Sequence, residues 1–194
     1  MTREEYYEDL KETFESLKYD TSYDVCYEES EEELNKLFNC IAYSLGFDDI
    51  WVWPLSIGIT IYPNKVIGGR LFSIYWPVGI PKNLSMNAFE QMYALFGYER
   101  CTDMRYEPGY KKIIIYGYDA KEISHAAVVC DGYCMSKMGK YVIIKHQADS
   151  LIRKEYGHII MCVRRKDNIS NVRDKETLFN NNGEKVHVSL EIPE

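Results

Sequence analysis

Apolar positions recur every three or four residues in three segments of the first half of the chain, and this period predicts amphipathic helices. The first helix is expected over 3–18. The second ends at Leu45, before Gly46, and the third runs from its cap Ser85 to about 96. The positions that define the three apolar faces are Tyr6, Leu10, Phe14 and Leu17; Leu34, Leu37, Phe38, Ile41, Ala42 and Leu45; and Met86, Phe89, Met92, Tyr93 and Phe96.

The second half of the chain is rich in β-branched and apolar runs, which predict strands. The expected strands cover 112–118, 123–130, 133–138, 141–144, 156–165 and, as an edge strand, 186–192. Asp131-Gly132 suits a two-residue hairpin turn, and this turn pairs Ser136 with Ala127. Helices followed by a mainly antiparallel sheet indicate an α+β fold, with the N-terminal helices packed on the sheet.

Less regular segments lie between these elements. Residues 20–30 are interpreted as an acidic connector, and 166–182 as a polar, Asn-rich loop. Residues 48–81 mix aromatic and turn-forming residues, which indicates a long insertion with one or two short strands, such as 57–61. An insertion of this length usually has a function, such as lining a cleft. The 194 residues are expected to form one domain, large enough for a core without disulfides or metal.

Charge and composition narrow the classes of function. A net charge of −7 gives no electrostatic footprint for a polyanion, so nucleic acid and anionic membranes are not predicted partners. No apolar run approaches the roughly 20 residues that cross a bilayer, and the N-terminus lacks the apolar core of a signal peptide. A cytoplasmic protein is therefore expected, with non-classical export left open, and its six cysteines are expected to be reduced.

Cys40 and His125 are the candidate chemistry of the chain. Asn39 is a suitable N-cap, which would place Cys40 in the first turn of a helix, where unpaired N–H groups favour a thiolate. His125 lies near the start of an apolar strand and would act as the general acid–base. The alternative starts the helix at the capping-box pattern Ser30-x-x-Glu33, which would leave Cys40 as a half-exposed bystander in the middle of it.

A series of short motifs carries a family resemblance. They are Asn39-Cys40-Ile41-Ala42, Trp53-Pro54, Tyr75-Trp76-Pro77, Gly97-Tyr98, Glu107-x-Gly109, His125-Ala126-Ala127, Ser136-Lys137-x-Gly139, Ile144-x-His146 and Tyr156-Gly157. Together they resemble an uncharacterised bacterial domain family over 38 to about 165. Their order, a Cys at the start of a helix followed by a His on a core strand, resembles the papain-like NlpC-type cysteine hydrolases.

The papain-like resemblance implies a Cys–His–polar triad that cleaves an amide, peptide or ester bond without a cofactor or metal. Cys40 would attack, and either His146 or Ser136 would orient His125. Residues 31–165 would form the papain-like core, with 1–30 as a helical extension and 166–194 as a C-terminal loop and edge strand. The substrate would be a peptide, a protein or a small amide or ester. The oligomeric state stays open.

Other candidate residues have two interpretations each. Trp53 and Trp76 either line a substrate cleft or cover the core, and Glu107 is either a substrate contact or a solvated loop carboxylate. Cys130 and Cys134, with His125 or His146, suggest zinc, although an ordinary hairpin turn between the cysteines disfavours it. A Ser136–Lys137 dyad is excluded because adjacent strand residues point to opposite faces.

Two functions of different classes therefore follow from the sequence. The first is the thiol hydrolase described above. The second is a non-catalytic binding or interaction module, an effector or defence-associated protein, that keeps the same scaffold; an acidic, tyrosine-rich chain with a long aromatic insertion suits a partner interface. The two hypotheses differ in whether the Cys40 thiol is reactive.

Overall fold

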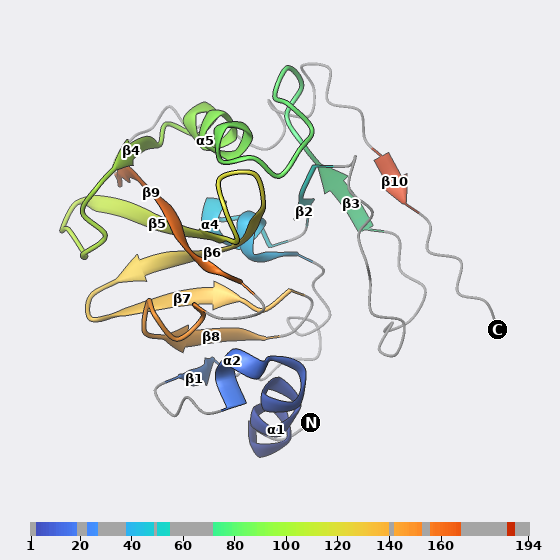
Figure 1. The fold of residues 1–194 in the computed structure, drawn as a ribbon, viewed down its shortest axis with the longest axis vertical. Coiled ribbons are helices and arrows are strands. Elements are labelled where there is room, and N and C mark those ends of the chain that lie inside the picture. Colours follow the sequence, from blue (N-terminus) through green and yellow to red (C-terminus); the bar gives the residue numbers. More distant parts are fainter. Residues whose placement is uncertain are drawn as a thin grey trace.

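The computed structural model describes residues 3–18, 23–26, 38–48, 50–54, 72–139, 142–152, 156–167 and 186–188. Within these residues the protein is an α+β fold built on one large antiparallel sheet (Figure 1). No helix in the described part of the chain is long and apolar enough to cross a membrane.

Seven described strands form the large sheet in the order β1-β8-β7-β6-β5-β9-β4. Their bounds are β1 Asp24–Cys26, β4 Glu99–Cys101, β5 Tyr110–Gly117, β6 Ile123–Cys130, β7 Tyr133–Lys137, β8 Ile143–His146 and β9 His158–Lys166. All neighbouring pairs are antiparallel. Figure 1 shows the strands stacked from β4 at the top to β1 at the bottom.

The predicted hairpin is confirmed with its register. Val128 pairs with Met135 and Cys130 with Tyr133, so Asp131-Gly132 forms the two-residue turn. Gly132 has a φ of 78°, a left-handed conformation that suits glycine. The same register places Ser136 on the sheet face that Ala127 occupies, as expected.

The large sheet separates two buried clusters, because successive side chains of a strand point to opposite faces. On β5, Ile113 and Ile115 belong to one cluster, and Ile114 and Tyr116 belong to the other. The first cluster includes α4 (Cys40–Leu45) and α5 (Met86–Leu95), and we call this side the α4 face. The second includes Leu10 and Leu17 from α1 (Arg3–Thr13) and α2 (Glu15–Lys18), and we call this side the α1 face.

The helices largely follow the apolar periods. The helix expected over 3–18 is interrupted at Phe14, which separates α1 from α2. Ser85 caps α5 as expected, because its side chain accepts a hydrogen bond from the Ala88 N–H at 3.2 Å. The α1–α2 pair lies beyond the β1 edge of the sheet in Figure 1, with α5 near the opposite edge.

A second, small sheet lies beside the large one, in the order β10-β3-β2. It consists of β2 (Trp51–Val52), β3 (Phe72–Tyr75) and β10 (Val186–Val188). The C-terminal edge strand was expected over 186–192; residues 186–188 form an edge strand of this small sheet, and 189–192 lie outside the described residues. The strand expected over 57–61 lies outside the described residues. β1 and β4 were not expected; each is three residues long, which is too short for alternation to signal a strand.

Asn39 joins the start of α4 to the small sheet. Its Oδ1 accepts hydrogen bonds from the N–H groups of Ala42 and Val52, at 3.0 and 3.1 Å. Its Nδ2 donates to the Val52 carbonyl at 2.8 Å. The buried side chain thus satisfies backbone groups of two elements at once, so it positions α4 and β2 relative to each other.

Replacing Asn39 with Ala is expected to lower the free energy of unfolding by about 2–4 kcal/mol, because the cap is lost and buried backbone groups lose their partner. Urea denaturation measures the change. The exposed Asn87 on α5 provides a matched control, and Asn87→Ala is expected to stay within about 0.5 kcal/mol of the unmodified protein. Equal stability of the two variants would contradict the role assigned to Asn39.

Candidate functional site

Cys40 is the first residue of α4, which decides between the two helix starts that the sequence left open. Asn39 has an extended backbone, with φ −107° and ψ 178°, and its side chain accepts from the Ala42 N–H. Neither Phe38 nor Asn39 is helical. A continuous helix through Cys40 from the Ser30 capping box is therefore excluded, and the expectation that Cys40 lies in the first turn is confirmed.

The Cys40 thiol lies inside the protein, with 5% of the residue exposed. Burial raises its pKa to about 11, even though the backbone N–H groups of Ala126 and Ile41 and the nearby Lys137 ammonium act in the opposite direction. The loss of hydration therefore exceeds the stabilisation of the anion by the helix start. At neutral pH the sulfur is a protonated thiol, which is a poor nucleophile.

His125 lies on the opposite side of the sheet from Cys40. Its ring stacks on Tyr156 at a centroid distance of 4.1 Å and lies 5.8 Å from Tyr116, and both tyrosines belong to the α1 face. The next residue, Ala126, belongs to the buried cluster of Cys40. Because adjacent strand residues point to opposite faces, the structure does not bring the predicted pair together.

The two candidates for the third position bond to each other. Ser136 Oγ lies 2.9 Å from His146 Nε2, and His146 Nδ1 lies 2.7 Å from the Gln147 carbonyl oxygen. A carbonyl only accepts, so Nδ1 carries a hydrogen. In the neutral ring Nε2 then accepts from the serine hydroxyl. Both residues are fully buried on the α1 face, where they form a satisfied polar pair.

His125 is the less satisfied imidazole of this face. Its Nε2 is buried and has no hydrogen-bond partner in the part of the chain that the structure describes, so neither Ser136 nor His146 bonds to this nitrogen. Burial lowers the pKa of His125 well below 6.5, and the nearby His146 lowers it further. The ring is therefore a neutral core residue in this structure.

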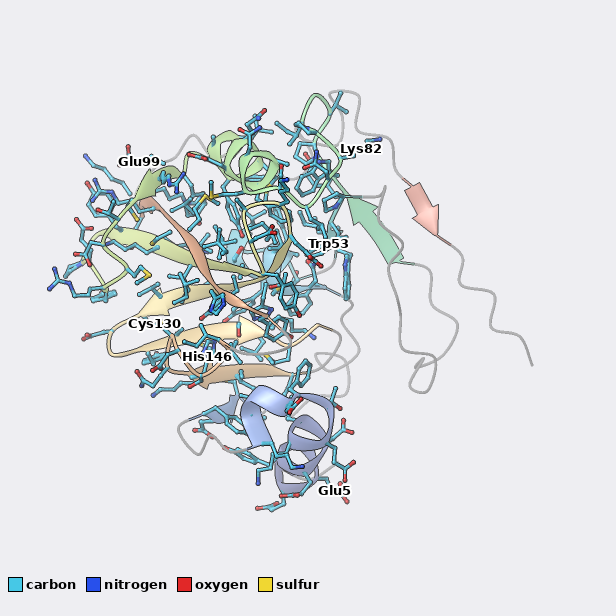
Figure 2. The ribbon with its side chains drawn as sticks, in the orientation of Figure 1. Glu5, Trp53, Lys82, Glu99, Cys130 and His146 are labelled. Atoms are coloured by element: carbon cyan, nitrogen blue, oxygen red, sulfur yellow. The ribbon has the colours of Figure 1, made fainter. Side chains whose placement is uncertain are left out.

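The two tryptophans pack against the same residue of α5. Trp53 and Trp76 make edge contacts with Phe89, at centroid distances of 5.8 and 5.1 Å. Trp76 is buried and donates to the Pro81 carbonyl, whereas Trp53 is half-buried. Figure 2 shows Trp53 on the side of the small sheet, away from His146 over β7 and β8. Both rings cover the core, and neither lies beside His125.

The cysteines that suggested zinc point apart. Cys134 pairs with Val129 across the hairpin, and Cys130 pairs with Tyr133. Cys130 and Cys134 therefore lie on opposite faces of the sheet, since Cys130 directly follows Val129. Among the described residues, no group of three or more His, Cys, Asp and Glu side chains is placed to hold a metal ion.

Glu107 is part of a buried-charge arrangement that sequence reasoning missed. Lys112 on β5 is 2% exposed, and its ammonium contacts three acceptors: the carbonyls of Asp103 and Arg105, at 3.1 and 2.9 Å, and Glu107 Oε2 at 2.9 Å. The carboxylate of Glu107 also pairs with Arg164 at 3.2 Å. The signal in the sequence was a lysine at the start of an apolar strand, where alternation turns one of Lys111 and Lys112 inward.

The segment 102–109, which we call the β4–β5 loop, is organised around this lysine. The side chain of Asp103 accepts from the backbone N–H and the guanidinium of Arg105, and these bonds lower the pKa of Asp103 to about 2. The loop exposes two large apolar side chains, Met104 at 43% and Tyr106 at 45%. The sequence gives no signal that Met104 and Tyr106 are exposed, because their exposure depends on the contacts that Lys112 makes with the loop.

A surface hollow of about 480 Å³ lies beside the β4–β5 loop, at the corner of the molecule that Glu99 marks in Figure 2. Its lining consists of Arg100, Cys101, Thr102, Asp103 and Arg164. The described residues thus contain a loop that is anchored to Lys112, exposes apolar side chains and adjoins a hollow, at the β4 edge of the sheet.

The protein is expected to lose stability as the pH falls below about 6.5. The folded pKa of His125 is depressed, so the unfolded chain binds the proton more tightly. The contribution of His125 is complete above the unfolded pKa and declines by at most about 1.4 kcal/mol per pH unit below it. Urea denaturation between pH 7.5 and 5 measures this slope.

His125→Phe is expected to flatten that slope, because the variant has no group to protonate at this position. His158→Phe is the matched control, since His158 is exposed on β9, and it is expected to keep the slope of the unmodified protein. An unchanged slope in His125→Phe would show that His125 is not the source of the acid sensitivity.

Comparison with known proteins identifies the family of the chain. No curated protein and no solved structure matches it, so the papain-like resemblance stays a prediction. A family model described as "Domain of unknown function (DUF7689)" matches residues 29–164. This match covers more than half of the chain, including α4, α5 and the strands of the large sheet from β4 to β8. The protein therefore belongs to the DUF7689 family.

Proposed function

We propose that the protein is a non-catalytic interaction module that binds a partner protein through the β4–β5 loop. The observation that carries this proposal is the exposure of Met104 and Tyr106 on a loop that a buried lysine anchors. The catalytic alternative requires a thiol and an imidazole in contact, whereas Cys40 and His125 lie on opposite faces of the sheet.

Anchoring makes the loop suitable for binding. The three hydrogens of the Lys112 ammonium have three acceptors, all of them in the loop. At the end of the loop, the Asp167 N–H donates to the Gly109 carbonyl at 3.0 Å. A loop held in one conformation loses little entropy on binding, so more of the contact free energy contributes to affinity.

The side chains of this surface are of the types that dominate protein interfaces. Tyr, Met and Arg are enriched there, and a few such residues usually supply most of the binding energy. Tyr106 and Met104 provide apolar anchors, and Arg100 and Arg164 line the adjoining hollow. Both arginines already pair with carboxylates of the chain, Arg100 with Glu90 and Arg164 with Glu99 and Glu107. We therefore expect a partner surface whose main feature is an apolar pocket for Tyr106.

Hydrolysis remains the second candidate because of the position of Cys40. The sulfur lies at the first residue of a capped helix, and the backbone N–H groups of Ala126 and Ile41 favour its anion. A papain-like hydrolase acting on an amide, peptide or ester would use these groups to hold the thiolate. It would also need a rearrangement that places a base beside the sulfur.

Photo-crosslinking tests the binding proposal with a matched pair of sites. Tyr106 and Tyr118 are both 45% exposed, but Tyr118 lies outside the β4–β5 loop. Benzoylphenylalanine at position 106, in cells that express the protein, is expected to give a discrete adduct that is absent with the probe at 118. For the purified partner, Tyr106→Ala is expected to weaken binding about 10-fold or more, and Tyr118→Ala less than about 2-fold.

The binding proposal fails if the two variants bind the crosslinked partner equally well. It also fails if the folded protein gives no adduct at 106, or the same adduct from both positions.

Alkylation of the native protein separates binding from hydrolysis. Cys40 is expected to react with iodoacetamide more slowly than the half-exposed Cys26 at pH 8, and its rate is expected to keep rising with pH until it levels off above about 11. Mass spectrometry of the digested protein measures both rates. A Cys40 that reacts faster than Cys26 at pH 7 would contradict the non-catalytic proposal and favour the hydrolase.

A further inference from the structure

Cys101 and Cys162 face each other across two strands at one edge of the large sheet. They are register partners in the antiparallel pair β4–β9. The Cys101 thiol donates to the Cys162 sulfur over a distance of 3.1 Å between the two Sγ atoms. Both sulfurs are close to the Asp103 carbonyl oxygen, at 3.7 and 3.9 Å. No role in the proposed binding or hydrolysis uses this pair.

We infer that Cys101 and Cys162 are a modification site, at which a small-molecule disulfide converts the two thiols into a cross-strand disulfide. The geometry supports this inference in two ways. Directly opposed residues of an antiparallel pair have Cα atoms about 4.5–5.5 Å apart, within the range of about 4.4–6.8 Å that disulfides span. The two sulfurs need to approach by only about 1 Å to reach bonding distance.

Access to the pair is unequal, and this sets the order of the reaction. Cys101 is half-buried and lines the surface hollow, so a small disulfide reaches it directly. Cys162 is buried behind it. Burial and the neighbouring Cys101 raise the pKa of Cys162, and the Lys112 ammonium opposes this shift. Cys101 is therefore the attacking thiol, and Cys162 is the resolving one.

The exchange proceeds in two balanced steps. The Cys101 thiolate attacks one sulfur of the small disulfide, forms a mixed disulfide and releases one thiolate. The Cys162 sulfur then loses its proton and attacks Cys101 Sγ, which forms the protein disulfide and expels the second thiolate. The two protein thiols are oxidised, and the small disulfide is reduced to two thiols, which take up the two protons.

The other described cysteines lack this arrangement. Cys130 faces Tyr133 and Cys134 faces Val129 across their hairpin, on opposite sides of the sheet. Cys40 lies on the α4 face, whereas Cys162 belongs to the α1 face. Cys26 faces Ile143 across the pair β1–β8. The inference is therefore specific to one pair, and Cys130 provides a control that is half-buried like Cys101.

Oxidised glutathione tests the inference on the full native chain. After acid quenching and blocking of free thiols, non-reducing digestion and mass spectrometry are expected to show a Cys101–Cys162 linked peptide. Two of the six thiols should be lost, and dithiothreitol should restore them. In Cys130→Ser the linked peptide should form at the same rate as in the unmodified protein.

Variants of Cys101 and of Cys162 distinguish the two steps of the exchange. Cys162→Ala is expected to stop at a glutathione adduct on Cys101, and Cys101→Ser is expected to leave Cys162 unmodified. Should Cys162→Ala not fold, Cys162→Ser serves the same purpose. The inference is overturned if native Cys101 keeps its glutathione adduct without forming the link. It is also overturned if the link forms no faster in the native protein than in urea, or if glutathione joins a different pair.

Discussion

The alternation of side chains across the large sheet is the constraint on which the arrangement of this protein depends. The sheet has a buried cluster on each face, so every strand residue belongs to one side or the other. This alternation places Cys130 and Cys134 on opposite faces, and it turns His125 away from the face on which α4 holds Cys40. It also places Ser136 with His146, and Cys101 opposite Cys162. A change of register by one residue would turn every side chain of a strand to the opposite face. The burial of apolar side chains on both faces disfavours such a change.

The buried polar groups of the protein differ in how far their hydrogen-bonding needs are met. The ammonium of Lys112 has three acceptors, and the pair of Ser136 and His146 is bonded at both ring nitrogens. His125 is the contrast, since its Nε2 has no partner among the described residues. The satisfied groups order the structure around them, whereas His125 makes the stability of the fold sensitive to protonation.

The thiol and the loop illustrate opposite uses of burial. Burial of Cys40 removes water from the sulfur, and the resulting rise in pKa suppresses the nucleophile that the helix start would otherwise favour. Burial of Lys112 instead directs an ammonium to loop carbonyls, and the loop that it holds exposes Met104 and Tyr106. The first arrangement keeps the Cys40 sulfur protonated at neutral pH, and the second holds two apolar side chains at the surface.

Local signals in the sequence were sufficient for elements whose chemistry is contained in a few neighbouring residues. Ser85 begins α5 because its side chain bonds to an N–H group three residues later. Asn39 begins α4 in the same way, but there the sequence also offered a start at Ser30. Asp131-Gly132 sets the hairpin register because a two-residue turn leaves one pairing. The short strands β1 and β4 were not predicted, because they are strands mainly through their pairing with β8 and β9. Both of these partners are distant in the chain.

The sequence by itself determined that Ser85 begins a helix, that His125 lies on a core strand, and that Ser136 shares a face with Ala127, but it left two possible starts for the helix of Cys40. Only the tertiary structure decided that α4 packs on the face opposite His125, that Lys112 turns into the β4–β5 loop, and that Cys101 meets Cys162. Hydrogen bonds of caps and turns act over a few residues and are therefore visible in the sequence. Which face a helix covers depends on the burial of apolar surface summed over the whole sheet, which no short segment contains.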